Sequence, residues 1–83
     1  MEKILIRLEV PSVNACYDVF IPRELKIGAL TALLADCVSN ITEGRYKPSG
    51  EEMLCFFDQR KVLDPALTAE EYGISNGDRL IML

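Results

Sequence analysis

The sequence predicts an α+β fold in which one helix packs against a mixed sheet of four to five strands. Between Lys3 and Pro22, apolar residues recur at every second position, as in half-buried strands. Between Lys26 and Ile41 the spacing changes to that of a helix, and beyond it short apolar runs alternate with turn residues. At 83 residues the chain has room for one small core, so we expect a single domain over residues 1–83.

The first two predicted strands form a hairpin. From Lys3 to Val10 every second residue is aliphatic, which is typical of a strand with one buried face. Residues 11–14 interrupt this pattern with a proline and an asparagine, as in a tight connection. The second strand follows over residues 16–21, antiparallel to the first, and Pro22 ends it because proline has no N–H to donate.

The predicted helix covers residues 26–41. Its apolar stripe falls within an arc of about 100° at 3.6 residues per turn. The stripe consists of Ile27, Leu30, Leu34, Cys37, Val38 and Ile41. The opposite side carries small residues such as Ala29 and Ala32, which could let another helix approach closely, although alanine is also the best helix former.

The second half of the chain supplies the remaining strands. A polar loop over residues 42–52 precedes a strand over residues 53–57 that is apolar on both faces, and Val62 and Leu63 form a short strand. Thr68 is a capping-type residue before a single helical turn. The last strand covers residues 79–83. This order matches the β-grasp plan, in which the later strands return beside the first through right-handed crossovers.

Composition excludes several classes of function. There are 9 basic and 13 acidic residues and no His, so the chain has a net charge of -4, no basic face for nucleic acid and no imidazole for acid–base catalysis. Cys16, Cys37 and Cys55 have neither disulfide nor zinc spacing, and we expect reduced thiols, with Cys37 in the core. The sequence contains neither a membrane-spanning run nor a secretion signal, so we expect no membrane insertion, no cofactor, no enzymatic activity and a cytoplasmic location.

The segment from Tyr72 to Leu80, which includes Gly73-Ile74 and Asn76-Gly77-Asp78, resembles the stretch before the last strand in the YukD family of bacterial ubiquitin-like proteins. Tyr17-Asp18-Val19 in the second strand is similar to that family's pattern as well, and the rest of the chain matches by element order. The resemblance implies a ubiquitin-like component or regulator of type VII (ESX) secretion, which exports WXG100 proteins from Gram-positive bacteria. It implies a protein partner from that secretion machinery.

A carrier function is the alternative. Ubiquitin and the sulfur carriers of thiamine and molybdopterin synthesis end in a flexible Gly-Gly tail that enters an adenylating enzyme. This sequence instead ends in Ile81, Met82 and Leu83 within the predicted last strand. We therefore expect a module that is not conjugated to other proteins and that acts through its surface.

The candidate site is the sheet face that points away from the helix. If alternate residues of each strand face the helix, an apolar set is left without cover, and such a patch is typical of a partner-binding surface. The set is Leu5, Phe20, Cys55, Phe57, Ile81 and Leu83. Two copies of the chain could also pair through it. The alternatives are ordinary exposure of a sheet face or a third strand shifted by one residue.

Overall fold

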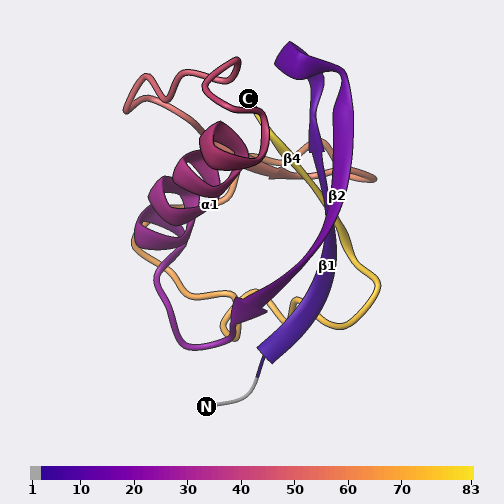
Figure 1. Ribbon diagram of the computed structural model, residues 1–83. Helices are drawn as coiled ribbons and strands as arrows, with labels where there is room; N and C mark the ends of the chain where they lie inside the picture. The colour runs from indigo at the N-terminus through magenta and orange to yellow at the C-terminus, as the bar shows by residue number, and fades with distance from the viewer. Residues whose placement is uncertain (1–2) are drawn as a thin grey trace.

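The computed structural model describes residues 3–83. In chain order the elements are β1 (Lys3–Val10), the 3₁₀ helix η1 (Pro11–Val13), β2 (Ala15–Pro22), α1 (Ile27–Ile41), β3 (Leu54–Phe56) and β4 (Arg79–Met82). The strands form one sheet in the order β2-β1-β4-β3, and α1 lies across one face of it (Figure 1). β1 and β4 are parallel and the other neighbours are antiparallel, so the fold is the predicted β-grasp with a four-stranded mixed sheet.

The β1–β2 hairpin is regular along its whole length. Eight consecutive residue pairs, from Lys3 with Pro22 to Val10 with Ala15, join the two strands. At the tip Asn14 adopts the left-handed conformation (φ 52°), and its amide donates to the Pro11 carbonyl at 3.0 Å. Asparagine tolerates this conformation better than most residues, so the local sequence fixes the register of the hairpin.

The core lies between α1 and the sheet face that it covers, which we call the inner face. The largest side chains that are almost fully buried there are Ile6, Leu8, Ile21, Ile27, Leu30, Leu54, Leu80 and Met82. β1 and β4 are the central strands, and both alternate between buried and more exposed residues. The alternation predicted for Leu80 and Met82 against Ile81 and Leu83 is confirmed.

The helix is rotated about its axis relative to the prediction. Cys37 and Ile41 were expected in the core but are exposed, whereas Thr31 and Ala35 are buried. The cause is the segment after β3, which packs on the Gly28 side of α1. There the Gly28 amide donates to the Pro65 carbonyl at 3.0 Å, and a β-carbon at position 28 would lie 3.2 Å from that of Pro65.

Two of the smaller predicted elements are present in reduced form. The expected short strand at residues 62–63 is an isolated bridge between Val62 and Cys55. Thr68 and Glu71 form a reciprocal capping box, in which each backbone amide donates to the other's side chain at 3.0 and 3.1 Å. A turn, with no regular helix, follows this box. The described residues between β3 and β4 therefore contain a bridge and a capped turn in place of the predicted strand and helical turn.

The turn before β4 ties the second half of the chain to the first. Asn76 Oδ1 accepts from the Leu5 amide at 2.8 Å, and the Gly77 amide donates to the Leu5 carbonyl at 2.9 Å. Asp78 accepts from the Ser75 amide at 2.9 Å, as the turn chemistry predicts. Gly77 has a positive φ of 91°, but Asn76 does not, so Asn76 contributes its side chain and not an unusual backbone conformation.

Candidate functional site

The face of the sheet opposite α1, which we call the outer face, carries the predicted site residues. Leu5, Phe20 and Leu83 are exposed, with Phe20 the most accessible at 68%. Phe57 and Ile81 are partly buried. Only part of the predicted set is therefore available to a partner.

Strand alternation places Cys55 on the outer face, but the residue is buried there, so the expectation of an accessible, partner-binding Cys55 is wrong. It retains 4% of its accessible area. On one side it pairs with Ile81 of β4, and on the other it forms the bridge to Val62. Burial raises the pKa of the Cys55 thiol, which keeps it protonated and unreactive at neutral pH.

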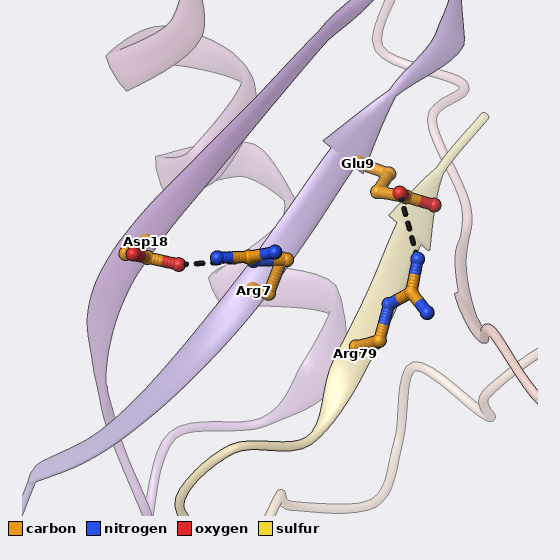
Figure 2. Close-up of polar contacts among 4 residues, drawn as sticks. All are labelled: Arg7, Glu9, Asp18 and Arg79. Carbon is orange, nitrogen blue, oxygen red and sulfur yellow. Dashed lines mark hydrogen bonds and ion pairs between the residues drawn. The ribbon is translucent and has the colours of Figure 1, made fainter.

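Four charged residues cross the middle of the outer face, and we call them the charged belt: Arg7, Glu9, Asp18 and Arg79. Figure 2 shows their two ion pairs, Arg7 Nε to Asp18 Oδ1 at 3.2 Å and an Arg79 guanidinium nitrogen to Glu9 Oε1 at 3.0 Å. The hydrogen bond and charge of Asp18 raise the pKa of Arg7 further above its already high value. The belt follows from the strand register, because Arg7 lies between Asp18 of β2 and Arg79 of β4.

The charged belt also covers the aromatic ring of Phe57. The Arg79 guanidinium carbon lies 3.8 Å from the centre of this ring, which is a cation–π geometry. The same guanidinium forms the ion pair with Glu9, so the Arg79 side chain contacts both Phe57 and Glu9. Arg79 therefore occupies one face of the Phe57 ring.

The apolar surface is consequently divided in two. On one side of the charged belt lie Leu5 and Phe20, which are direct cross-strand partners and form what we call the edge patch. On the other side lies the end patch, formed by Met53, Ile81 and Leu83. Met53 and Leu83 exchange two main-chain hydrogen bonds of 2.9 Å, and both side chains are exposed.

Met53 was missed in the sequence reasoning. It stands two residues before Cys55 and four before Phe57, so strand alternation already placed it on the outer face. The alternation was the signal that could have found it.

A carboxylate organises the long loop between α1 and β3. Glu52 accepts from the Tyr46 hydroxyl at 3.0 Å and from the amides of Ser49 and Gly50 at 2.6 and 3.1 Å. Burial alone would raise the pKa of Glu52, but these hydrogen bonds outweigh it and lower the pKa. Burial and the bond to Glu52 raise the pKa of Tyr46 to about 12. These hydrogen bonds hold the loop between α1 and β3 in place.

The small-residue side of α1, our second candidate surface, lines an open groove of about 520 Å³. Gly28, Ala32 and Asp36 form one wall, and Met53 and Val62 lie on the other. The groove is formed mainly by apolar side chains, with Asp36 and Glu52 as its charged members.

Within residues 3–83, no three His, Cys, Asp or Glu side chains lie close enough together to hold a metal ion. Over the same residues, no helix has both the length and the apolar character required to cross a bilayer. Cys16 and Cys37 are exposed free thiols, which corrects the expectation of a core Cys37.

Comparison with known proteins identifies the fold. No protein-family model and no curated protein matches the sequence. Among solved structures, the ubiquitin-like domain of EccD5 from Mycobacterium xenopi superimposes with a TM-score of 0.82 at 18% identity, covering 100% of this chain and 94% of that one. The ubiquitin-like domain of the Mycobacterium tuberculosis type VII secretion protein EccD1 does so with 0.79 at 11% identity, covering 100% and 99%.

The chain also matches part of a larger assembly. It superimposes with a TM-score of 0.80 at 18% identity on a chain of the MycP5-free ESX-5 inner membrane complex, covering all of this chain and 21% of that one. At these identities the similarity establishes the shared architecture. This chain has the ubiquitin-like fold.

Proposed function

We propose that this chain is a ubiquitin-like interaction module of a type VII secretion system, which acts in the cytoplasm without catalysis or conjugation. It binds a protein of that machinery through the end patch of Met53, Ile81 and Leu83. The observation that carries the proposal is the exposure of Leu83 (58%) and Met53 on the outer face, where the structure brings no other residue of the described chain to cover them.

Two further points support this assignment. Ubiquitin-like domains that superimpose on the whole chain occur in type VII secretion proteins, which agrees with the YukD-like pattern of the segment before β4. The end patch is bordered by the charged belt, and a polar rim around an apolar centre is the usual anatomy of a protein interface.

The test uses a host in which this chain and a type VII system are both encoded. Leu83→Ser should weaken copurification of the secretion machinery and export of WXG100 substrates by about tenfold or more, as for a residue central to an interface. Ile81→Ser should act in the same direction. Leu83→Ser should not alter the melting temperature by more than a few degrees, since its side chain is exposed, whereas Ile81→Ser also removes a partly buried side chain and should lower it further.

The matched control is Leu33→Ser. Leu33 is exposed to a similar extent, 52%, but lies on α1, on the other layer of the molecule. This variant should export normally. Normal export by Leu83→Ser, or equal loss in the Leu33 variant, would contradict binding through the end patch. A mass increase of the wild-type chain after incubation with ATP and an adenylating enzyme would favour the carrier alternative.

A further inference from the structure

The two edges of the sheet differ in what covers them. At the β3 edge, the Leu63 amide donates to the Leu54 carbonyl at 2.8 Å and the Phe56 amide donates to the Lys61 carbonyl at 3.0 Å. The chain thus satisfies the main-chain groups that β3 directs outward. At the opposite edge, β2 pairs with β1 and has no second neighbouring strand.

The hydrogen bonds of β1 show which groups of β2 point outward. The Leu5 carbonyl accepts from Gly77 and the Arg7 amide donates to Asp78, so these two residues direct their main chain toward the β4 side. Successive residues of a strand direct their polar groups to alternate sides. Ile4 and Ile6 therefore direct their main chain toward β2, where they pair with Ile21 and Val19.

By the same alternation, the main chains of Cys16, Asp18 and Phe20 point away from β1. No hydrogen bond from these three amides to another described element occurs. They form a row of donors and acceptors along the open side of β2. Such a row is a template for pairing with another strand.

β2 also lacks the features by which natural edge strands avoid pairing. It is eight residues long, contains no lysine, and keeps an unbroken register with β1, so no bulge twists it away. Its one charged side chain, Asp18, is paired with Arg7. Its one proline, Pro22, is the last residue of the strand.

We propose that β2 pairs antiparallel with β2 of a second copy of this chain, around a two-fold axis at Val19. The two sheets then form one continuous sheet, and the amides of Cys16, Asp18 and Phe20 donate to carbonyls of the other copy. An antiparallel strand pair is self-complementary, so the same edge serves both copies.

The side chains select this register. With Val19 on the axis, Asp18 lies opposite Phe20 of the other copy. A register centred on Asp18 would place two like charges directly opposite each other, which is destabilising. A register centred on Phe20 would pair only residues 18–22 of each strand, whereas the register centred on Val19 pairs residues 16–22.

The pairing also explains the exposure of Phe20. At 68% it is the most exposed large apolar side chain of the described residues. In the proposed register the two copies of Phe20 are diagonal neighbours on the outer face, at a separation that aromatic side chains span. Each ring would then be covered by the other and by the hydrocarbon part of Asp18.

Concentration-dependent amide exchange of the purified wild-type chain tests the pairing. Raising the concentration from about 10 µM to about 1 mM should slow exchange at Cys16, Asp18 and Phe20 by about tenfold. Tyr17 and Val19 should already be protected at the low concentration, because their amides bond to β1. Sedimentation equilibrium should show a dimer over the same range. A monomer throughout, with no change at the three amides, would overturn the proposal.

A cysteine pair tests the register. In a Cys16→Ser, Cys37→Ser background, which removes the exposed thiols, Val19→Cys should form a disulfide-linked dimer on mild oxidation, because adjacent non-hydrogen-bonded residues approach closely enough. Asp18→Cys in the same background is the control and should form little disulfide-linked dimer, because the two copies of position 18 are not directly opposite each other. Crosslinking of the Asp18 variant without the Val19 variant would refute the axis at Val19.

Phe20→Asp places a carboxylate directly opposite Asp18 of the other copy and should abolish the dimer, whereas Leu33→Asp on α1 should leave it intact. A dimer that survives Phe20→Asp would contradict pairing through β2. These measurements use the isolated chain, whereas the export test depends on Leu83. Failure of the β2 pairing would therefore not contradict binding through the end patch, and the reverse also holds.

Discussion

Along β1, Ile4, Ile6 and Leu8 are buried under α1, while Leu5 and Arg7 from the same strand face solvent on the other side of the sheet. The inner face is apolar throughout. The outer face alternates apolar patches with the charged belt. The inner face of the sheet therefore stabilises the fold, and the outer face carries the side chains that can contact other molecules.

The largest effect should come from the inner face. Leu80→Ala removes a fully buried side chain from the central strand β4 and should lower the free energy of unfolding by about 2–5 kcal/mol. Its neighbour Ile81→Ala, on the outer face and partly exposed, should cost less than half as much. Chemical denaturation of the two variants measures the difference, and equal losses would erase the distinction between the faces.

Glu52→Gln tests the loop that precedes β3. In this loop Glu52 accepts a hydrogen bond from the hydroxyl of Tyr46, which belongs to the core cluster. The substitution should cost about 1 kcal/mol through weaker hydrogen bonds to the carboxylate. The folded-state pKa of Glu52 is lowered, so its contribution is present above the ordinary carboxyl pKa and is lost as the pH falls through the folded value.

The measurement is stability against pH. The wild type should lose more stability than Glu52→Gln between about pH 5 and pH 3. Tyr46 behaves in the opposite sense. Its pKa is raised to about 12, so its contribution is complete below its ordinary value of 10.0 and is lost as the pH rises toward 12. Identical acid profiles for the two proteins would show that the carboxylate does not hold the loop.

Arg79→Ala tests whether the charged belt stabilises the outer face. It removes an exposed ion pair to Glu9 and the contact with Phe57, so we expect a loss of about 1 kcal/mol or less, reduced further by salt. Glu9→Gln removes only the ion pair and should cost less. A thermal melt of each variant at low and high ionic strength separates the two contributions, and a loss as large as that of Leu80→Ala would contradict a surface role.

Phe20→Ser should have the smallest effect on stability. The side chain is mostly exposed in the single copy, so the change should remain within about 0.5 kcal/mol at a dilution that keeps the chain monomeric. Dilute thermal melts provide the measurement. A large loss of stability would mean that the Phe20 ring packs within the monomer and stabilises it as the residues of the inner face do.

Much of the fold was predictable because its signals are local. The period-2 pattern of β1 and β2, the helical spacing over α1 and the turn before β4 each depend on neighbouring residues, and all three are confirmed. The ubiquitin-like arrangement followed from the order of these elements. The general position of the outer face could be predicted for the same reason.

The errors arise where distant segments meet. The rotation of α1, which exposes Cys37, depends on Pro65 packing against Gly28. The burial of Cys55 depends on a bridge to Val62. The charged belt depends on the β1–β4 register, which places Arg79 beside Arg7 and within reach of Glu9. None of these contacts has a periodicity that a single sequence displays.

The parallel pairing of β1 with β4 has a consequence for synthesis on the ribosome. Leu5 and Asn76, which are 71 residues apart, are joined by a hydrogen bond where the turn before β4 meets β1. While the chain is being translated, the hairpin and α1 emerge long before the strand that completes their core. The apolar residues of the hairpin and of α1 therefore stay exposed to solvent until β4 has been synthesised. Chaperones that bind unfolded chains would act most strongly during that interval.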